Sequence, residues 1–388
     1  MSAGVEVVPW SEVADAYLIN TCAVTEHSEK KSRNLISRAH RLAPDAPIFV
    51  TGCYGELRKD EISAFAGVRK VFGAGEKTAI VPEILSSLGL EFVGKAAGGA
   101  VMEAYSSGDR TRAFLKVQDG CDNFCAYCTV PLARGRSRNI PICSLVRQAG
   151  EIAATGIKEI VLTGVNTGDF GRTTGESFLD LLKALNEVPG IERYRISSIE
   201  PNLLTDEIID WIASGTKFQP HFHIPLQSGS DALLRRAGRR YDTAAFAGRI
   251  DRVREKMGDC VFFGIDVIVG LPGETDELFE ETYRFLSERI SPAFLHIFPY
   301  SRRPGTRAAA FPDQVQDRIK TARVERLEEL NTRLQEAFRE HCRGLRETVL
   351  WESSDKSGQM QGYTGNYIRL TAPYDPSRIG KLEEITIP

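Results

Sequence analysis

The sequence predicts an α/β protein in three parts, and three patterns support this prediction. Strand-like and helix-like stretches alternate over residues 1–97. From residue 113 on, short apolar runs and helical stretches follow one another regularly, which is typical of parallel βαβ units. Beyond residue 343 the apolar residues stand at every second position, which favours a small all-β unit.

The totals agree with several domains and restrict the partners. A chain of 388 residues, 42% of them hydrophobic, can bury more than one core, since single cores stop growing at roughly 250–300 residues. We place the domains at residues 1–97, 98–343 and 344–388. The net charge of -3 gives no overall positive field, so a nucleic acid would have to be held by local basic patches.

The chain lacks the patterns of a membrane or secreted protein. Its apolar runs fall short of the ~20 residues that span a bilayer, and its first residues lack the charged and apolar regions of a signal peptide. We therefore expect a cytoplasmic protein without a membrane partner. In that reducing compartment its eight cysteines are better candidates for metal binding or catalysis than for disulfides.

Two strands and the helix between them predict the N-terminal domain. The runs DAYLIN at 15–20 and PIFVTG at 47–52 are short and apolar. Residues 28–42 have the length and charge of a helix with one exposed face. Together they indicate a small α/β domain. Residues 93–109, which are rich in Gly, Ala and Ser, are expected to form a linker.

Six apolar runs separated by helical stretches predict the central domain. The runs cover residues 113–120, 159–165, 193–200, 221–228, 262–270 and 293–300. Helices are expected at Ile142–Thr155, Phe178–Glu187, Thr205–Ala213, Asp231–Glu255 and Asp276–Glu288, and a long charged helix at Pro312–Arg343. Because no dinucleotide-binding glycine pattern accompanies them, an incomplete (β/α) barrel is favoured over a doubly wound sheet. In either fold the ligands bind at the carboxyl ends of the strands.

The tail is predicted to form a small β unit. Residues 347–354, 359–373 and 381–388 alternate with period two, and turns are expected at 355–358 and 375–378.

Three cysteines follow the first strand of the central domain with the spacing C-x3-C-x2-C, at Cys121, Cys125 and Cys128. A structural zinc site closes four ligands, and a cubane iron–sulfur cluster has four irons to ligate. One interpretation is a zinc clip completed by a distant residue. The other is a cluster with one iron left open for a ligand, because an open metal position is typical of a catalytic site.

This cysteine motif, with Tyr127 before its last cysteine, resembles the radical S-adenosylmethionine (SAM) superfamily. The resemblance implies a 4Fe-4S cluster on Cys121, Cys125 and Cys128 whose open iron binds SAM. An electron from the cluster then cleaves SAM to a 5′-deoxyadenosyl radical. The cofactor supplies this chemistry, and the protein supplies its position and excludes water.

Further phrases resemble the methylthiotransferase family within that superfamily. They are INTCAVTEHSEKKSR, FVTGCYGEL, LTGVNTG, RISSIEP, HIPLQSGS, DVIVGLPGET and HIFPYSRRPGT, and the tail GYTGNYIRL resembles the small RNA-binding TRAM-like barrel that ends these enzymes. The resemblance favours enzymes that add a methylthio group to C2 of N6-threonylcarbamoyladenosine at position 37 of tRNA. It implies a second, auxiliary 4Fe-4S cluster, with one SAM methylating its sulfur and another making the radical that takes the C2 hydrogen.

The family holds its auxiliary cluster with three N-terminal cysteines, and this chain matches two of them, Cys22 and Cys53. We expect the third ligand to be missing from the chain. A truncated or misassigned start is one explanation, and a natural variant that lost or replaced the ligand is the other. In both cases the N-terminal, Rossmann-like domain would lack its first strand.

The resemblance also implies that polar residues at the strand ends of the barrel contact SAM. The candidates for the SAM pocket are Tyr127, Gly164, Asn166, Ser198, Glu200, Gln227 and Ser228. Ordinary loop polarity or helix capping is the alternative for the strand-end residues. Asp266 is either a satisfied in-strand polar residue or faces the substrate. His221 and His223 share one strand face, and we expect hydrogen-bonded barrel histidines there rather than ligands.

Arginine clusters after strand ends are together the expected tRNA surface, because the planar guanidinium suits phosphate. For any single arginine, a solvated surface charge is the alternative. The candidates for RNA binding are Arg134, Arg136, Arg138, Arg302, Arg303, Tyr363 and Tyr367. The two tyrosines either stack on bases or belong to the core of the small barrel.

The implied partners are tRNA, SAM, a reducing electron donor of the flavodoxin or ferredoxin type, and a sulfur donor. One alternative keeps the chemistry but acts on isopentenyladenosine-37 tRNA or on a ribosomal protein. Another is a non-catalytic iron–sulfur protein that binds RNA.

Overall fold

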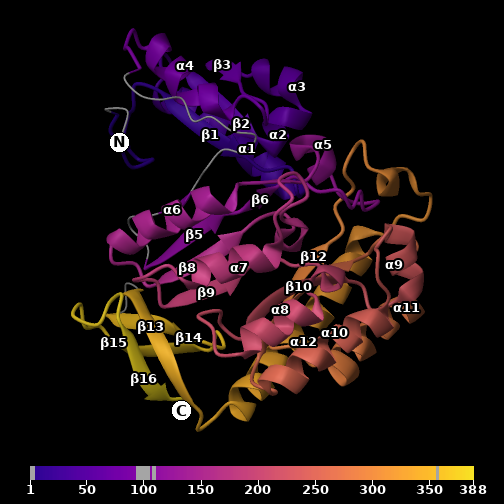
Figure 1. The fold of residues 1–388 in the computed structure, drawn as a ribbon. Helices are drawn as coiled ribbons and strands as arrows, with labels where there is room; N and C mark the ends of the chain where they lie inside the picture. The colour runs from indigo at the N-terminus through magenta and orange to yellow at the C-terminus, as the bar shows by residue number, and fades with distance from the viewer. Residues whose placement is uncertain (1–4, 93–104, 107–110, 355–357) are drawn as a thin grey trace. The chain divides into compact units, whose positions relative to one another are not determined.

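The structure, a computed structural model, describes residues 5–92, 105–106, 111–354 and 358–388 (Figure 1). These residues form two compact units. The first comprises residues 5–92, 120–136 and 301–310, and the second comprises the other described residues. Most of the expected linker and most of the expected turn at 355–358 lie outside the described residues. Within the described ranges, no helix carries an apolar stretch long enough to cross a membrane.

A three-stranded parallel sheet forms the centre of the first unit. Its order is β1 (Tyr17–Thr21), β2 (Ile48–Gly52) and β3 (Val68–Val71). The two predicted strands are confirmed: β1 alternates buried and exposed residues, and β2 is almost wholly buried. Sequence reasoning missed β3, because two central charged residues leave its apolar pattern too short to recognise.

Helix α1 (Glu26–Leu42) confirms the predicted amphipathic helix and has clear end signals. The Ser28 backbone N–H donates to the side chain of Thr25 over 3.1 Å, which caps the first turn. Ile36 and Ala39 are buried in the same core cluster as the strands. The unit's other helices are α2 (Cys53–Leu57), α3 (Lys59–Ser63), α4 (Ile80–Ser87) and α5 (Val130–Arg134).

Six parallel strands run through the second unit in chain order (Figure 1). They are β5 (Arg112–Lys116), β8 (Glu159–Thr163), β9 (Arg193–Ile196), β10 (His221–Gln227), β11 (Phe262–Val269) and β12 (Phe294–Pro299). The first three form one sheet, with β4 (Tyr105–Ser106) antiparallel at its edge, and the last three form another. Parallel bridges from Tyr194 to Phe218 and from Ser198 to His223 connect the two sheets. The six predicted strands are confirmed.

Helices follow the strands as βαβ units require. They are α6 (Ile142–Ala154), α7 (Phe178–Asn186), α8 (Asp206–Ala213), α9 (Asp231–Ala237), α10 (Thr243–Met257), α11 (Asp276–Arg284) and α12 (Asp317–His341). A small antiparallel pair, β6 (Gln118–Asp119) and β7 (Arg138–Asn139), accompanies them.

The prediction of one helix over Asp231–Glu255 is wrong. Gly238, at φ 75°, ends α9 in the left-handed conformation that glycine adopts without strain. Asp242 then caps α10, because its side chain accepts from the Ala245 N–H over 2.8 Å. Two other boundaries differ: α11 continues as a π-helical turn over Phe285–Ile290, and α12 starts at Asp317 rather than Pro312.

The tail forms a four-stranded antiparallel sheet of order β15-β14-β13-β16, as its period-two pattern indicates. The strands are β13 (Arg346–Ser354), β14 (Gln359–Thr364), β15 (Arg369–Pro373) and β16 (Leu382–Thr386). Val349, Trp351 and Met360 are buried in its core. The expected turn at 375–378 is confirmed by the Arg378 N–H, which donates to the Asp375 carbonyl over 3.1 Å.

A buried ion cluster joins this sheet to the parallel strands of the same unit. Arg195 on β9 donates to both carboxylate oxygens of Glu159 on β8, over 2.8 and 3.3 Å. Its remaining N–H groups donate to the carbonyls of Thr364 and Gly365, over 2.7 and 2.8 Å. Burial alone would raise the pKa of Glu159, but neighbouring guanidinium groups, Arg195 first among them, hold it below its usual value.

Candidate functional site

The cysteine loop of the first unit is closed by contacts between its two ends. Gly120 stands at φ 76°, and a side chain there would lie 2.0 Å from the carbonyl oxygen of Arg136. The Cys121 N–H donates to the Gly135 carbonyl over 3.1 Å. Between the first two cysteines, Phe124 has φ 48°, a conformation that a bulky residue adopts only where its surroundings impose it. The loop backbone is therefore held in one narrow arrangement.

Backbone N–H groups are aimed at several of the sulfur atoms. Cys121 Sγ accepts from the N–H two residues further on over 3.5 Å, and Cys128 Sγ does so over 3.4 Å. Cys22 Sγ has the same contact, with the N–H of Val24 over 3.5 Å. Hydrogen bonds of this kind favour the deprotonated, metal-bound form of sulfur and tune cluster potentials. These sulfurs therefore fit thiolate ligands of a cluster.

Cys22 and Cys53 follow directly after two neighbouring parallel strands. Thr21 at the end of β1 is in register with Gly52 at the end of β2, so the next residue of each strand leaves the sheet at the same edge. Gly52 has φ 101°, and a side chain there would lie 2.2 Å from the Thr21 carbonyl oxygen. Both cysteines line a cavity of about 210 Å³, together with Asn20 and other residues of the same unit.

Two arginines predicted to bind RNA lie beside these cysteines. The Arg134 side chain donates from Nε to Cys53 Sγ over 3.2 Å and lines the same cavity. Arg303 is buried and pairs with Glu29. Burial lowers the pKa of Arg303, while the charges of Glu26 and Cys22 act in the opposite direction. Sequence reasoning missed the contact of Arg134 with a cysteine sulfur. The available signal was its position at the end of α5, the helix that begins just after the cysteine motif.

The strand ends of the second unit bring several predicted SAM-pocket residues together. The backbone N–H groups of Val165 and Asn166 both donate to Gln118 Oε1 over 3.0 Å. Ser198 accepts a backbone hydrogen bond from Thr167 over 3.1 Å, which joins the loop after β8 to the end of β9. The side chain of Asn166 is 3% exposed, and neither of its polar atoms has a hydrogen-bond partner among the described residues. An unpartnered buried amide of this kind fits a site that a polar ligand completes.

Gly164 belongs to the same tight region. A side chain at Gly164 would lie 3.0 Å from Gln118 Oε1, so the residue makes close backbone approach possible.

Other predicted pocket residues have partners within the chain. Glu200 is buried and pairs with Arg239. Ser228 is fully buried, and its Oγ lies 3.1 Å from the Thr282 hydroxyl on α11. Gln227 has φ 73° at a register shift between β10 and β11, so its backbone is strained where β10 ends. Tyr127 is half-buried in the cysteine loop.

The remaining RNA-binding candidates divide by exposure. Arg136 is exposed and lies 3.3 Å from Asp122, and Arg302 is also exposed and donates to the Ala309 carbonyl over 2.8 Å. Arg138 is half-buried and lies 3.5 Å from Asp119. Tyr363 and Tyr367 stack on each other with ring centroids 4.7 Å apart.

Both tyrosine rings also lie within the second unit's own aromatic cluster. The Tyr367 ring lies 4.6 Å from the ring of His221, and the guanidinium of Arg112 lies over both tyrosines.

Two known protein families match two separate stretches of the chain. Residues 115–286 match the radical SAM superfamily, and residues 1–73 match the uncharacterized protein family UPF0004.

Curated relatives cover nearly the whole chain. It is 38% identical over 401 residues to threonylcarbamoyladenosine tRNA methylthiotransferase MtaB of Bacillus subtilis (strain 168), an alignment that covers 99% of this chain and 88% of that protein. It is 33% identical over 409 residues to tRNA-2-methylthio-N(6)-dimethylallyladenosine synthase of Nitratidesulfovibrio vulgaris (strain DP4), covering 100% and 90%.

Among solved structures, the fold resembles that of the radical S-adenosylmethionine methyltransferase TsrM from Kitasatospora setae. That structure carries cobalamin and a 4Fe-4S cluster, and the TM-score is 0.56 at 17% identity. The match covers 75% of this chain and 64% of that one. At this identity the likeness concerns the fold alone.

Proposed function

The chain belongs to the radical SAM methylthiotransferase family, and we propose that it adds a methylthio group to C2 of N6-threonylcarbamoyladenosine at position 37 of tRNA. The observation that carries the proposal is the pair of cysteine sets in one compact unit, with N–H donors directed at their sulfurs. The choice of substrate is supported by the 38% identity to a threonylcarbamoyladenosine-specific relative, against 33% to a dimethylallyladenosine one.

Each cysteine set has a separate role in this proposal. Cys121, Cys125 and Cys128 would hold a 4Fe-4S cluster, and the chemistry that this cluster would supply is the one-electron reduction that cleaves SAM to methionine and a 5′-deoxyadenosyl radical. Cys22 and Cys53 would supply two ligands of the auxiliary cluster. Arg134 would donate its hydrogen bond to a cluster ligand, and its positive charge would balance part of the negative charge that a thiolate-ligated cluster brings into a small cavity.

We take the parallel strands of the second unit to be an incomplete (β/α)6 barrel. The ends of these strands would contact SAM. Asn166 and the backbone around Gly164 are the polar groups that the adenosine and methionine parts of SAM would meet. Glu200 and Ser228 would support the SAM pocket without contacting SAM, because their side chains already pair with Arg239 and Thr282. Gln227 stays a candidate for direct contact.

Exposed arginines of the first unit and the C-terminal sheet of the second unit are each candidates for contact with tRNA. Arg136 and Arg302 are exposed and suit phosphate contacts. We take the tail to be a TRAM-like RNA-binding unit, with Tyr363 and Tyr367 as its candidate RNA contacts. A low-potential electron donor of the flavodoxin or ferredoxin type and a sulfur donor complete the reaction.

The test is a reaction with two anticodon stem-loops that differ only at position 37, one with threonylcarbamoyladenosine and one with isopentenyladenosine. The anaerobically reconstituted protein, SAM, dithionite and sodium sulfide as the sulfur donor are added, and the nucleosides are analysed by mass spectrometry. We expect the 2-methylthio product from the first stem-loop, in excess by about 100-fold or more, since a site built for polar groups rejects substrates that lack them.

Two results would count against the proposal. Preferential methylthiolation of the isopentenyladenosine stem-loop would change the substrate but keep the chemistry. The absence of both products and of 5′-deoxyadenosine, from protein with intact cluster absorbance, would favour the non-catalytic RNA-binding alternative.

A further inference from the structure

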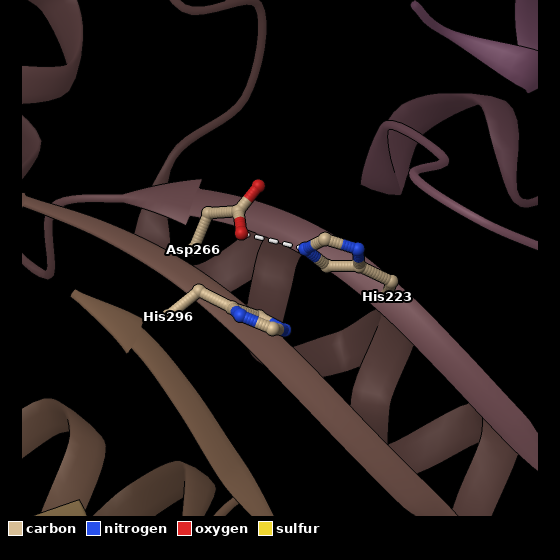
Figure 2. A group of neighbouring side chains, drawn as sticks. All are labelled: His223, Asp266 and His296. Carbon is tan, nitrogen blue, oxygen red and sulfur yellow. Dashed lines mark hydrogen bonds and ion pairs between the residues drawn. The ribbon is translucent and has the colours of Figure 1, made fainter. Parts of the chain in front are cut away.

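Three side chains that the proposed reaction does not use meet on neighbouring strands of the second unit. They are His223 on β10, Asp266 on β11 and His296 on β12 (Figure 2). In the sheet register, Asp266 lies beside His296, and His223 lies beside Gly264, two residues before Asp266. Because side chains alternate along a strand, all three project from the same face.

The three side chains converge on one point. One ligand atom from each lies within 4.8 Å of the others. Figure 2 shows His223 and Asp266 joined by their contact, with Nε2 and Oδ1 2.6 Å apart, and His296 beside them. The two imidazole rings have centroids 4.6 Å apart. Two imidazoles and one carboxylate are a donor set that binds transition-metal cations in open, three-ligand sites.

A glycine makes room for this arrangement. Gly264 stands in the middle of β11, a central strand, where glycine weakens a sheet and often marks a close approach. A side-chain carbon at this position would lie 3.4 Å from His296 Nε2, in contact with the imidazole. A larger side chain would push the His296 ring away from His223 and Asp266.

The hydrogen bonding of the histidines suits a metal ligand. Among the described residues, none hydrogen-bonds to the His296 ring. His223 has Ser198 Oγ 3.4 Å from Nδ1, on the side away from Asp266. A hydroxyl there can fix the ring orientation, as the outer partners of metal-bound histidines do.

The two histidines are accessible from a cavity inside the unit. His223 and His296 line a cavity of about 610 Å³ whose wall also includes Tyr363, Tyr367 and Arg369. A cation bound by three protein ligands would keep positions open toward this cavity for water or an oxygen ligand.

We propose that His223, Asp266 and His296 form a binding site for a divalent transition-metal cation such as Zn²⁺. This differs from the expectation that the barrel histidines only form hydrogen bonds. Ligands of one tetrahedral zinc ion, at about 2.0–2.1 Å, lie roughly 3.3 Å apart. On binding, the His223 and Asp266 ligand atoms, which are 2.6 Å apart, must therefore separate slightly, and the His296 nitrogen must approach them. Side-chain rotation of His296, which no hydrogen bond from the described residues holds, provides this movement. The site does not depend on the proposed reaction.

The test is Zn²⁺ titration of the protein with both iron–sulfur clusters in place, so that the cluster cysteines are occupied. Calorimetry measures stoichiometry and affinity, and zinc-edge X-ray absorption measures the ligand distances. We expect one Zn²⁺ per chain with nitrogen and oxygen ligands at about 2.0 Å, whereas cysteine sulfur would lie at about 2.3 Å. Asp266→Asn and His296→Asn should each weaken Zn²⁺ binding by about 100-fold or more. Loss of an outer partner of a metal ligand already costs about 10–100-fold in affinity, and these variants change the ligands themselves.

The matched control is His341→Asn, which makes the same change at the exposed end of α12 and should bind Zn²⁺ as the unaltered protein does. The proposal is overturned if no stoichiometric Zn²⁺ binds. It is also overturned if the absorption spectrum reports sulfur ligands, or if the two site variants bind like the control. Should a site variant fail to fold, the ligand distances in the unaltered protein alone decide.

Discussion

The variant Cys121→Ala/Cys125→Ala/Cys128→Ala is expected to lose 5′-deoxyadenosine formation entirely and about half of its iron. The three alanines remove every protein ligand that we assign to the radical SAM cluster, and a cubane without thiolate ligands is not retained. The unaltered protein should hold about eight irons per chain after anaerobic reconstitution and the variant about four. Iron and acid-labile sulfide are counted chemically, and the nucleoside is quantified by chromatography.

A cysteine outside both sets provides the control. Cys143 is exposed on α6, and Cys143→Ala should keep both the iron and the activity. If the triple variant still formed 5′-deoxyadenosine, the assignment of the cluster to this loop would be wrong. If the unaltered protein held only about four irons, all lost in the variant, Cys22 and Cys53 would hold no cluster in this chain.

Arg195→Met is expected to destabilise the second unit by about 3–5 kcal/mol, because it leaves Glu159 buried with its best partner removed. It also leaves the Thr364 and Gly365 carbonyls without their guanidinium donor, which loosens the C-terminal sheet. Denaturant unfolding gives the free energy, and amide hydrogen exchange over the strands β13–β16 reports the sheet. Those strands should exchange faster than the parallel strands.

The pH dependence follows from the lowered pKa of Glu159. A carboxyl group with a lowered folded pKa stabilises the fold above its unfolded pKa of about 4.3, and this stabilisation is lost as the pH falls through the folded pKa. The difference in unfolding free energy between Arg195→Met and the unaltered protein should therefore be full at pH 7. It should shrink as the pH falls below about 4.3.

Two further variants separate the buried pair from a general effect of removing arginine. Arg289→Met removes an exposed partner of Asp251 and should change the unfolding free energy by about 1 kcal/mol at most. The double variant Glu159→Gln/Arg195→Met should recover part of the loss, because the Glu159 charge is removed together with its partner. The recovery is only partial, because buried Arg193 then loses its ion pair with Glu159, 3.6 Å away. An effect of Arg195→Met no larger than that of Arg289→Met would show that the pair does not hold the sheet.

The periodic elements could be predicted from sequence, because each is encoded locally. The apolar runs of the parallel strands and the 3.6-residue pattern of α1 each lie within one segment. The C-x3-C-x2-C loop is similarly local. The prediction failed at Gly238, where the residue composition suits a helix on both sides and only the left-handed backbone separates α9 from α10. It also missed β3, which is held by pairing with β2 rather than by its own pattern.

The contacts that complete the sites could not be predicted, because they join distant segments. Arg134 meets Cys53 across 81 positions, and nothing in the charge of an arginine tells a sulfur partner from a phosphate. The buried position of Arg195 depends on the docking of a sheet that begins 151 residues later, at Arg346. His296 joins His223 and Asp266 only through the register of three strands.

In the proposed reaction a SAM-derived radical takes the hydrogen from C2 of the modified adenine. A stem-loop whose threonylcarbamoyladenosine carries deuterium at C2 checks this step, by measuring the mass of the 5′-deoxyadenosine released. We expect one deuterium in the 5′-deoxyadenosine and the methylthio group at C2 of the same adenine. Methylthiolated RNA formed with unlabelled 5′-deoxyadenosine would contradict it.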